Sequence, residues 1–289
     1  DEGLVGSEMC IRDSPLSWLF NIATSARKRR QKKEAWKPDQ KVIVVGNLSI
    51  GGNGKTPFVI WLANLLKSKG LKPGIVSRGY RSASTQFPLE INENTSVSAS
   101  GDEPKLIYNQ TSCPTVISPN RVEAVKFLLK KHECDIIISD DGMQHYKLGR
   151  DIEVALVDGF RKFGNGFTFP AGPLREPLSR LKDVNYIINT NKFRSEEEEL
   201  TNKDTLMTYE PVSWIKLNTG EEQKIKDWSL SKLVYGVAGI ANPNNFFSTL
   251  RNLGFEVIEN SFPDHHTFSK VDFMDLEDLP IIMTEKDAI

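Results

Sequence analysis

The sequence predicts an α/β fold, in which helices flank a mostly parallel sheet and a second, smaller α/β domain follows. Two observations lead to this prediction. Short apolar runs rich in β-branched residues alternate with segments of helical spacing, which is typical of a parallel sheet covered by helices. A glycine-rich turn separates the first apolar run from the first helix, and a second strand–glycine–helix unit follows a polar stretch.

The expected elements follow in chain order. Residues 41–47, "KVIVVGN", form a β-branched run typical of a buried parallel strand. Residues 57–70 have one apolar face and end at a glycine, and residues 120–132 are amphipathic with Asn120 as a candidate N-cap. Residues 82–100 are rich in Ser, Thr and Asn and are expected to be irregular. Further strands are expected at 72–80, 115–118, 134–141, 154–158, 185–190, 233–240 and 255–262, with a helix at 242–254.

The domain boundaries follow from changes in composition. Residues 1–14 have no usable periodicity, so we leave them unassigned and expect them to be extraneous. Residues 15–36 form an amphipathic, basic segment, and residues 37–210 form the main domain. Residues 211–232 are expected to be linker strands and residues 233–289 a smaller C-terminal α/β domain. Because the chain lacks an initial Met and stops just after a strand-like run, we expect a fragment with a truncated C-terminal domain.

Composition narrows the class of protein. The 289 residues carry a net charge of −1, so no global basic field recruits nucleic acid, and we expect no nucleic-acid partner. The three cysteines are odd in number and lack CxxC spacing, which argues against a disulfide framework or a zinc site and favours a reducing cytosol. No apolar run is long enough to span a bilayer, and no signal peptide is recognisable. Nothing indicates an obligate protein partner.

The front of the chain combines an apolar stretch with a cationic cluster. Residues 15–26 are mostly apolar, and residues 27–33, "RKRRQKK", carry six basic side chains in seven positions. About a dozen apolar residues are too few to cross a bilayer, which needs ~20. A short apolar helix followed by basic residues favours a position on an anionic membrane surface, where each Lys or Arg contributes ~1 kcal/mol. The alternative is a docked helix with a solvated basic tail.

Residues 49–57, "SIGGNGKTP", have the composition of a phosphate-binding loop. Glycines allow successive backbone N–H groups to point inward, and the following helix start adds unpaired donors. Lys55 is placed to reach the β- and γ-phosphates, and the Thr56 hydroxyl to bind Mg²⁺. The sequence therefore predicts a P-loop NTPase-like fold. The predicted nucleotide-binding residues are Ser49, Gly51, Gly52, Asn53, Gly54, Lys55 and Thr56.

Two positions in this loop depart from related patterns. Ser49 stands where the general P-loop pattern has its first glycine. Ile50 stands where dimeric cargo-delivering ATPases of similar loop sequence need a lysine, which argues against that class.

Two aspartates end the strand at 134–141, "CDIIISDD". Ligands of doubly wound sheets bind at the carboxyl ends of strands, and a carboxylate there can hold Mg²⁺ directly or through water. Asp140 and Asp141 are therefore the predicted metal-binding pair, together with Thr56. The alternative is an aspartate that caps a turn.

Several stretches together resemble one known family. "DDGMQHYKLGRD" at 140–151 is similar to a motif of the lipid A 4'-kinase family, the tetraacyldisaccharide 4'-kinases, and "VGNLSIGGNGKTP" at 45–57 agrees with its nucleotide loop, in which Ser or Thr takes the first position. Other similar stretches are "SRGY" at 77–80, "GDEP" at 101–104, "SPNRVEA" at 118–124, "PAGPLREPL" at 170–178, residues 238–257, "FPDHHTFS" at 262–269 and "TEKDA" at 284–288. They occur in family order over roughly residues 15–289.

The resemblance implies a reaction and a place for it. ATP, with Mg²⁺, would phosphorylate the 4'-hydroxyl of tetraacyldisaccharide 1-phosphate, a lipid A precursor. Members act at the cytoplasmic face of the Gram-negative inner membrane and carry a hydrophobic N-terminal helix that helps to anchor them. The main domain would then be a P-loop kinase domain, and its partners the lipid A precursor and the inner-membrane lipid surface.

The resemblance also implies roles for individual residues. Asp102 would accept the proton of the sugar hydroxyl, with His265 as its partner after the two domains close. From the residues alone, Asp102 is equally well explained as a helix N-cap and His265 as an exposed turn residue. The resemblance places Glu176 near the Mg²⁺–ATP site. From the residues themselves, Arg78 and Arg121 are candidates to bind a substrate phosphate or transition-state charge. His145 is a candidate to position phosphates or metal ligands, and Arg175 to contact anionic groups. For each arginine, the alternative is a surface ion pair.

The preferred interpretation is therefore an ATP-dependent lipid A 4'-kinase at the inner membrane. Two alternatives stay open: a soluble P-loop kinase of a small metabolite, and a non-kinase P-loop ATPase that delivers cargo.

Overall fold

The computed structural model describes the backbone of residues 2–51, 54–159, 161–190, 204–276 and 278–289, with side chains from residue 16 onward. The chain divides into two compact units, Asp1–Thr208 and Tyr209–Ile289.

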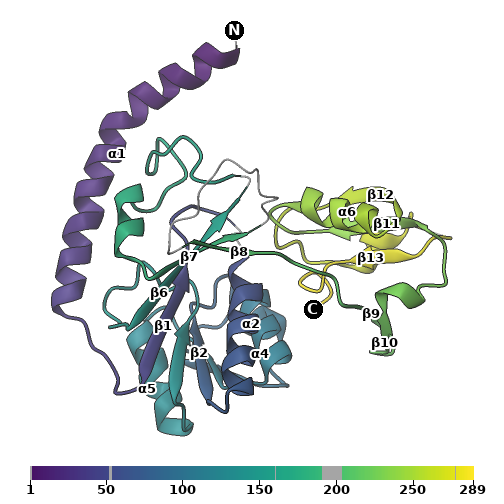
Figure 1. Cartoon of the computed structure of the whole chain (residues 1–289), viewed down its shortest axis with the longest axis horizontal. Helices are drawn as coiled ribbons and strands as arrows, with labels where there is room; N and C mark the ends of the chain where they lie inside the picture. The colour runs from purple at the N-terminus through teal and green to yellow at the C-terminus, as the bar shows by residue number, and fades with distance from the viewer. Residues whose placement is uncertain (1, 52–53, 160, 191–203, 277) are drawn as a thin grey trace. The chain divides into compact units, whose positions relative to one another are not determined.

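The first unit contains an eight-stranded sheet with the strand order β3-β4-β2-β5-β1-β6-β7-β8. Figure 1 shows helices flanking this sheet. All neighbours pair in parallel except β3 and β4, which are antiparallel. A mostly parallel sheet flanked by helices is the fold that the sequence predicts. The strands are β1 (Lys41–Gly46), β2 (Pro73–Ser77), β3 (Leu89–Ile91), β4 (Thr115–Ile117), β5 (Ile136–Ser139), β6 (Ile152–Asp158), β7 (Tyr186–Thr190) and β8 (Asp204–Met207).

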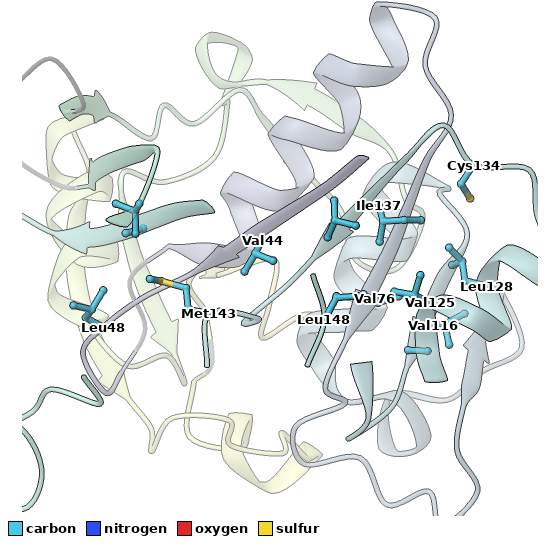
Figure 2. Packing of buried hydrophobic residues seen from close by; sticks show 14 of the residues in the cluster. Val44, Leu48, Val76, Val116, Val125, Leu128, Cys134, Ile137, Met143 and Leu148 are labelled. Atoms are coloured by element: carbon cyan, nitrogen blue, oxygen red, sulfur yellow. The ribbon is translucent and has the colours of Figure 1, made fainter. Parts of the chain in front are cut away.

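Strand β1 lies inside the sheet and is buried on both faces, as its unbroken β-branched run indicates. Val42 and Val44 point to one face, where α5 (Arg121–Lys131) packs, and Figure 2 shows this cluster with Val44, Val125 and Leu128. Ile43 and Val45 point to the other face. That face carries α2 (Lys55–Ser68) and α4 (Asp102–Thr111). The first unit also contains the short helix α3 (Val97–Ser100) and the 3₁₀ helix η1 (Leu178–Asp183). The two layers fix the carboxyl ends of β1, β2 and β5 at one edge.

Helix α1 (Glu2–Lys33) is the longest element of the chain. Residues 2–14, which the sequence left unassigned, are helical and continue without a break into the predicted apolar and basic segment. Within the described part of the chain, no helix has the combined length and apolarity needed to cross a bilayer.

The second unit is built on a three-stranded parallel sheet of order β12-β11-β13. Its core contains Val234, Leu250, Phe255 and Ile282. Trp214, from the segment expected to be a linker, is partly buried and packs edge-on against Phe255 of this core. The elements are β9 (Ser213–Ile215), β10 (Glu222–Lys224), η2 (Ile225–Asp227), β11 (Leu233–Ala238), α6 (Pro243–Asn252), β12 (Glu256–Ser261), η3 (Lys270–Phe273) and β13 (Ile281–Met283).

Candidate active site

The glycine loop joins β1 to α2, as a phosphate-binding loop requires. Gly54 immediately precedes α2 with φ of 74°, a left-handed conformation that glycine adopts without strain. Gly46 leaves room for Met143, whose Cγ would lie 2.6 Å from an added Cβ. The Asn47 side chain donates to the Gly51 carbonyl (3.2 Å) and closes the loop. Gly52 and Asn53, both predicted nucleotide-binding residues, lie outside the described residues.

Asp140 is a buried carboxylate with one unused oxygen. It follows β5 and is only 2% exposed. Ser77 donates to its Oδ2 (2.9 Å), whereas Oδ1 has no hydrogen-bond partner within the described structure. Burial, with the charges of Glu103 and Asp141, raises the pKa of Asp140 to about 6. A buried acceptor without a donor is the arrangement that a bound cation or its water would satisfy.

Asp141 lies next to two cations and has φ of 45°. Lys55 Nζ is 3.6 Å from its Oδ1, and Arg175 Nη1 is 3.3 Å from both carboxylate oxygens. Burial disfavours the charged carboxylate, but Lys55 and Arg175 outweigh burial and hold the pKa of Asp141 below its ordinary value. The structure therefore brings the loop lysine, the aspartate pair and Arg175 together at one sheet edge.

Thr56 and Ser49 belong to the same edge. Thr56 is buried in the first turn of α2, next to Lys55. Ser49 forms an isolated β-bridge with Leu174, just before Arg175. The residues available for Mg²⁺ are thus two carboxylates and a hydroxyl, and Mg²⁺ in kinase sites typically takes one or two carboxylates and completes its shell with phosphate and water. The chemistry of these donors fits the ion.

Glu176 is buried in a network that the sequence did not predict. Tyr146 Oη donates to Glu176 Oε1 (2.5 Å), and Gln144 Nε2 is 3.4 Å from Oε2. Lys28, from α1, lies 4.0 Å from Oε1 and 5.1 Å from the centre of the Tyr146 ring. Burial and the charge of Arg180 lower the pKa of Lys28. Helix α1 thus contributes a cation next to this carboxylate.

The network continues through Arg180 to Glu153. Arg180 Nε donates to Tyr146 Oη (2.9 Å) and its Nη2 lies 2.5 Å from both Glu153 oxygens. Arg150 Nη1 also donates to Glu153 (2.6 Å). Burial and the negative charge of Glu176 raise the pKa of Tyr146, so its hydroxyl stays a donor at neutral pH.

His145 and Arg121 lie near the aspartates. Burial and the positive charge of Arg121 lower the pKa of His145 to about 3, so the imidazole is neutral at physiological pH. Arg121 is almost fully buried and donates to the main-chain oxygens of Ser118 (2.7 Å) and Asp140 (3.0 Å). Burial lowers the Arg121 pKa to about 10, and its charge still acts on Asp141. Arg78, which follows β2, is exposed.

Asp102 is the first residue of α4, and Gly101 is the N-cap. The Asp102 carboxylate accepts a hydrogen bond from the Glu103 amide (2.9 Å). The negative charge of the neighbouring Glu103 contributes to the raised pKa of Asp140.

His265 belongs to the second unit, in the loop after β12. Its amide donates to the Gly239 carbonyl (2.9 Å). Its Nε2 lies 3.6 Å from Asp264 Oδ2 and 3.5 Å from Lys286 Nζ. Since Asp102 belongs to the first unit, the pairing of Asp102 with His265 stays a prediction.

Sequence reasoning missed the residues that support the site. Ser77, Gln144, Tyr146 and Arg150 lie inside motifs already quoted, "SRGY" and "DDGMQHYKLGRD", so a signal was present. Lys28 was read only as part of a cationic cluster. Its contact with Glu176 spans 148 residues of sequence and leaves no local pattern.

The strand–glycine–helix unit, the lysine at the helix start and the two carboxylates at the adjacent strand end define a P-loop nucleotide-binding protein. Comparison with known proteins narrows this class. The family model of the tetraacyldisaccharide-1-P 4'-kinases, LpxK, matches residues 13–289. The chain therefore belongs to the tetraacyldisaccharide-1-P 4'-kinase family and is a kinase, as the motifs predict.

Individual relatives agree with the family model. The chain is 48% identical over 278 residues to tetraacyldisaccharide 4'-kinase from Legionella pneumophila (strain Lens), covering 95% of this chain and 82% of the relative. It is 45% identical over 281 residues to the enzyme of that name from Haemophilus influenzae (strain 86-028NP), covering 96% and 82%. The crystal structure of LpxK from Aquifex aeolicus in complex with ATP superposes with a TM-score of 0.77 at 30% identity, covering 96% of this chain and 89% of that one.

Proposed function

We propose that this chain transfers the γ-phosphoryl group of ATP to the 4'-hydroxyl of tetraacyldisaccharide 1-phosphate, at the cytoplasmic face of the inner membrane. The observation that carries the proposal is the contact between Lys55 and Asp141 beside the unpaired Asp140 oxygen. This arrangement, in a chain of this kinase family, is suited to a nucleoside triphosphate and its metal ion.

The end of the glycine loop and the residues beside it have proposed roles in nucleotide and metal binding. The backbone around Gly54 and the start of α2 hold the phosphates, and Lys55 neutralises their charge. Thr56, Asp140 and Asp141 are the proposed Mg²⁺ ligands, and the family resemblance adds Glu176 to this set. The bound ion supplies charge neutralisation at the β- and γ-phosphates. Arg175 contacts Asp141 in the free protein and is positioned to exchange this partner for a phosphate oxygen.

Proton transfer is assigned to Asp102 and His265. Phosphoryl transfer needs positioning and an acceptor for the hydroxyl proton. In this proposal, closure of the two units brings His265 to Asp102, which accepts the proton of the sugar hydroxyl. Arg78, Arg121 and neutral His145 supply substrate-phosphate contacts or positive potential.

The membrane location is supported by the outer face of α1. Trp18, Leu19 and Ile22 are largely exposed. The exposed cations Arg29, Arg30 and Lys33 follow these three residues by 11 positions each, about three helical turns, and therefore continue the same face. Moving a lipid with four acyl chains from the bilayer into water costs ~0.8 kcal/mol of free energy for each exposed CH₂ group. An enzyme bound to the membrane surface can reach such a substrate without this cost.

The test is a phosphorylation assay on vesicles that contain the disaccharide 1-phosphate, with ATP and Mg²⁺. The bisphosphate should form, and Asp102→Ala should lower kcat at nearly unchanged nucleotide affinity, because the base acts only in the transfer step. Equal turnover of an acyl-free, water-soluble disaccharide would favour a soluble metabolite kinase instead. Membership of a kinase family removes the cargo-delivering ATPase from the alternatives.

A further inference from the structure

A loop between β6 and η1 exposes two aromatic side chains. We call residues 163–176 the aromatic loop. Phe167 is 44% exposed and Phe169 is 50% exposed, while Thr168 between them is buried. Thr168 forms an isolated β-bridge with Leu174, and the exposed rings of Phe167 and Phe169 flank this bridge. The proposed phosphoryl transfer uses neither ring.

The aromatic loop is held by many hydrogen bonds, so the exposure of its rings is built into the fold. The Phe169 amide donates to the Leu174 carbonyl (2.8 Å), and the Leu174 amide donates to the Phe167 carbonyl (3.2 Å). Asn165 Nδ2 donates across the loop to the Ala171 carbonyl (2.7 Å). Exposed apolar side chains on a fixed frame mark an interaction surface more strongly than single residues on a loose loop do.

The loop is attached to α1 at its aromatic end. Ser17 is buried, its Oγ donates to the Thr168 carbonyl (2.7 Å), and the Ala171 amide donates to the same Oγ (3.2 Å). The Phe20 and Phe169 rings meet edge to face at 5.8 Å. Figure 1 shows α1 passing this loop between β6 and η1.

This contact makes the apolar surface continuous. Phe20 and Leu16 are four residues apart on α1, and Leu16 and Leu19 are three apart, so each pair is adjacent on the helix. Leu19 and Ile22 repeat the spacing of three. The apolar side chains thus run from the aromatic loop across Phe20 to the exposed outer face of α1.

We propose that Phe167 and Phe169 insert into an anionic phospholipid bilayer and form, with the outer face of α1, one two-element membrane-binding surface. The inference deepens the proposed function and rests on its membrane location. Charge complementarity selects this occupant: Arg29, Arg30 and Lys33 continue the apolar face of α1 as a cationic stripe. A second copy of this chain would bring the same cations against each other.

The loop also joins this surface to the nucleotide loop. The Ile50 amide donates to the Pro173 carbonyl (2.8 Å), and the Arg175 amide donates to the Leu48 carbonyl (2.6 Å). One short segment therefore carries the aromatic rings at one end and Arg175 and Glu176 at the other. Insertion of the rings would present the phosphate-binding edge to the interface at which the lipid substrate lies.

The experiment measures sedimentation of the full chain with vesicles of phosphatidylethanolamine and phosphatidylglycerol. Phe167→Ser/Phe169→Ser should weaken partitioning roughly tenfold, because two half-exposed rings no longer enter the acyl region. Phe167→Trp/Phe169→Trp should preserve it. The matched control is Val271→Ser/Met274→Ser, which removes two exposed apolar side chains from the second unit and should leave binding unchanged.

A second readout places a probe directly at the surface. Nitrobenzoxadiazole attached to Phe169→Cys, in a Cys10→Ser background, should gain fluorescence and shift to shorter wavelength with anionic vesicles. The two described cysteines, Cys113 and Cys134, are buried and should stay unlabelled. No spectral change on vesicles that bind the protein would overturn the proposal.

The outcomes separate this inference from the proposed location. If the wild type fails to bind vesicles, both the proposed membrane location and the proposed role of the aromatic loop are overturned. If Arg29→Ser/Arg30→Ser/Lys33→Ser abolishes binding but the double Phe→Ser variant binds normally, only the aromatic loop is overturned. A wild-type dimer in solution that becomes monomeric in the double Phe→Ser variant, with vesicle binding unchanged, would assign the rings to a second copy instead.

Discussion

The two units of this chain share a strand–loop–helix arrangement but place different charges beside the loop. In each, a parallel strand leads through a glycine-containing loop into a helix: β1 into α2, and β11 into α6. The first helix begins with Lys55, which faces Asp141. The second begins with Pro243, and the amide of Gly239 in its loop already donates to Asp287 Oδ2 (3.0 Å).

The difference shows what turns such a loop into a nucleotide site. In the second unit, one loop amide is already satisfied by a carboxylate of the same unit. The first unit instead places Asp141, just after the neighbouring strand β5, next to the loop lysine Lys55. Backbone geometry supplies the donors, whereas the placement of charge decides which anion is bound.

The largest effect is expected from a substitution that removes the lysine charge of the first loop, which the loop of the second unit lacks. Lys55→Ala should lower kcat/KM by about 10³-fold, because in the proposed mechanism this lysine neutralises the charge of the nucleotide phosphates. Steady-state phosphorylation assays measure the loss. Lys69→Ala, at the far exposed end of α2, is the matched control and should retain activity. Activity within tenfold of wild type for Lys55→Ala would contradict the comparison.

The next effect concerns pH and the buried Asp140. Its pKa is raised to about 6 in the folded protein, so the folded state binds the proton more tightly than the unfolded state does. The resulting instability is absent below the ordinary aspartate pKa, grows as pH rises, and is complete above about pH 6. In protein free of metal and nucleotide, Asp140→Asn should therefore raise the free energy of unfolding by about 3 kcal/mol at pH 8, and by about half of that at pH 5.

Urea denaturation at the two pH values measures this difference. Asp39→Asn replaces an exposed aspartate and serves as the control. A stability gain for Asp140→Asn that is equal at both pH values would show that the gain does not come from the buried charge.

Local patterns predicted the parts of the molecule that are local. The β-branched runs indicated β1 and β5. The glycine loop and the aspartate pair indicated a cluster of Lys55, Asp140 and Asp141 at one edge of the sheet. Strand β3 was missed because three residues at the antiparallel edge of the sheet are too few to show a period. The Glu176 network was missed because its partners, Lys28 and Tyr146, are far apart in sequence and meet only through the fold.

A smaller effect is expected from the loop of the second unit. Asp287→Ala removes the acceptor of both the Gly239 amide and the Thr284 hydroxyl (2.6 Å). Leaving these donors unpaired should cost about 2 kcal/mol of local stability. Hydrogen exchange at the Gly239 amide should accelerate accordingly, while Asp275→Ala, an exposed control, leaves it unchanged. Unchanged exchange in Asp287→Ala would mean that this carboxylate does not satisfy the loop.

The smallest expected effect tests how firmly Glu176 is held. Tyr146→Phe removes the hydroxyl between Glu176 and Arg180 but keeps the ring that Lys28 covers. Gln144 and Lys28 still contact Glu176, and Glu153 still binds Arg180. We therefore expect the free energy of unfolding to fall by about 1 kcal/mol and kcat/KM to fall about fivefold. Tyr186→Phe, at an exposed tyrosine, is the matched control. If Tyr146→Phe lowered kcat/KM as much as Glu176→Ala does, the Tyr146 hydroxyl alone would hold the Glu176 carboxylate in position. The proposed nucleotide site would then depend on one side chain outside the glycine loop.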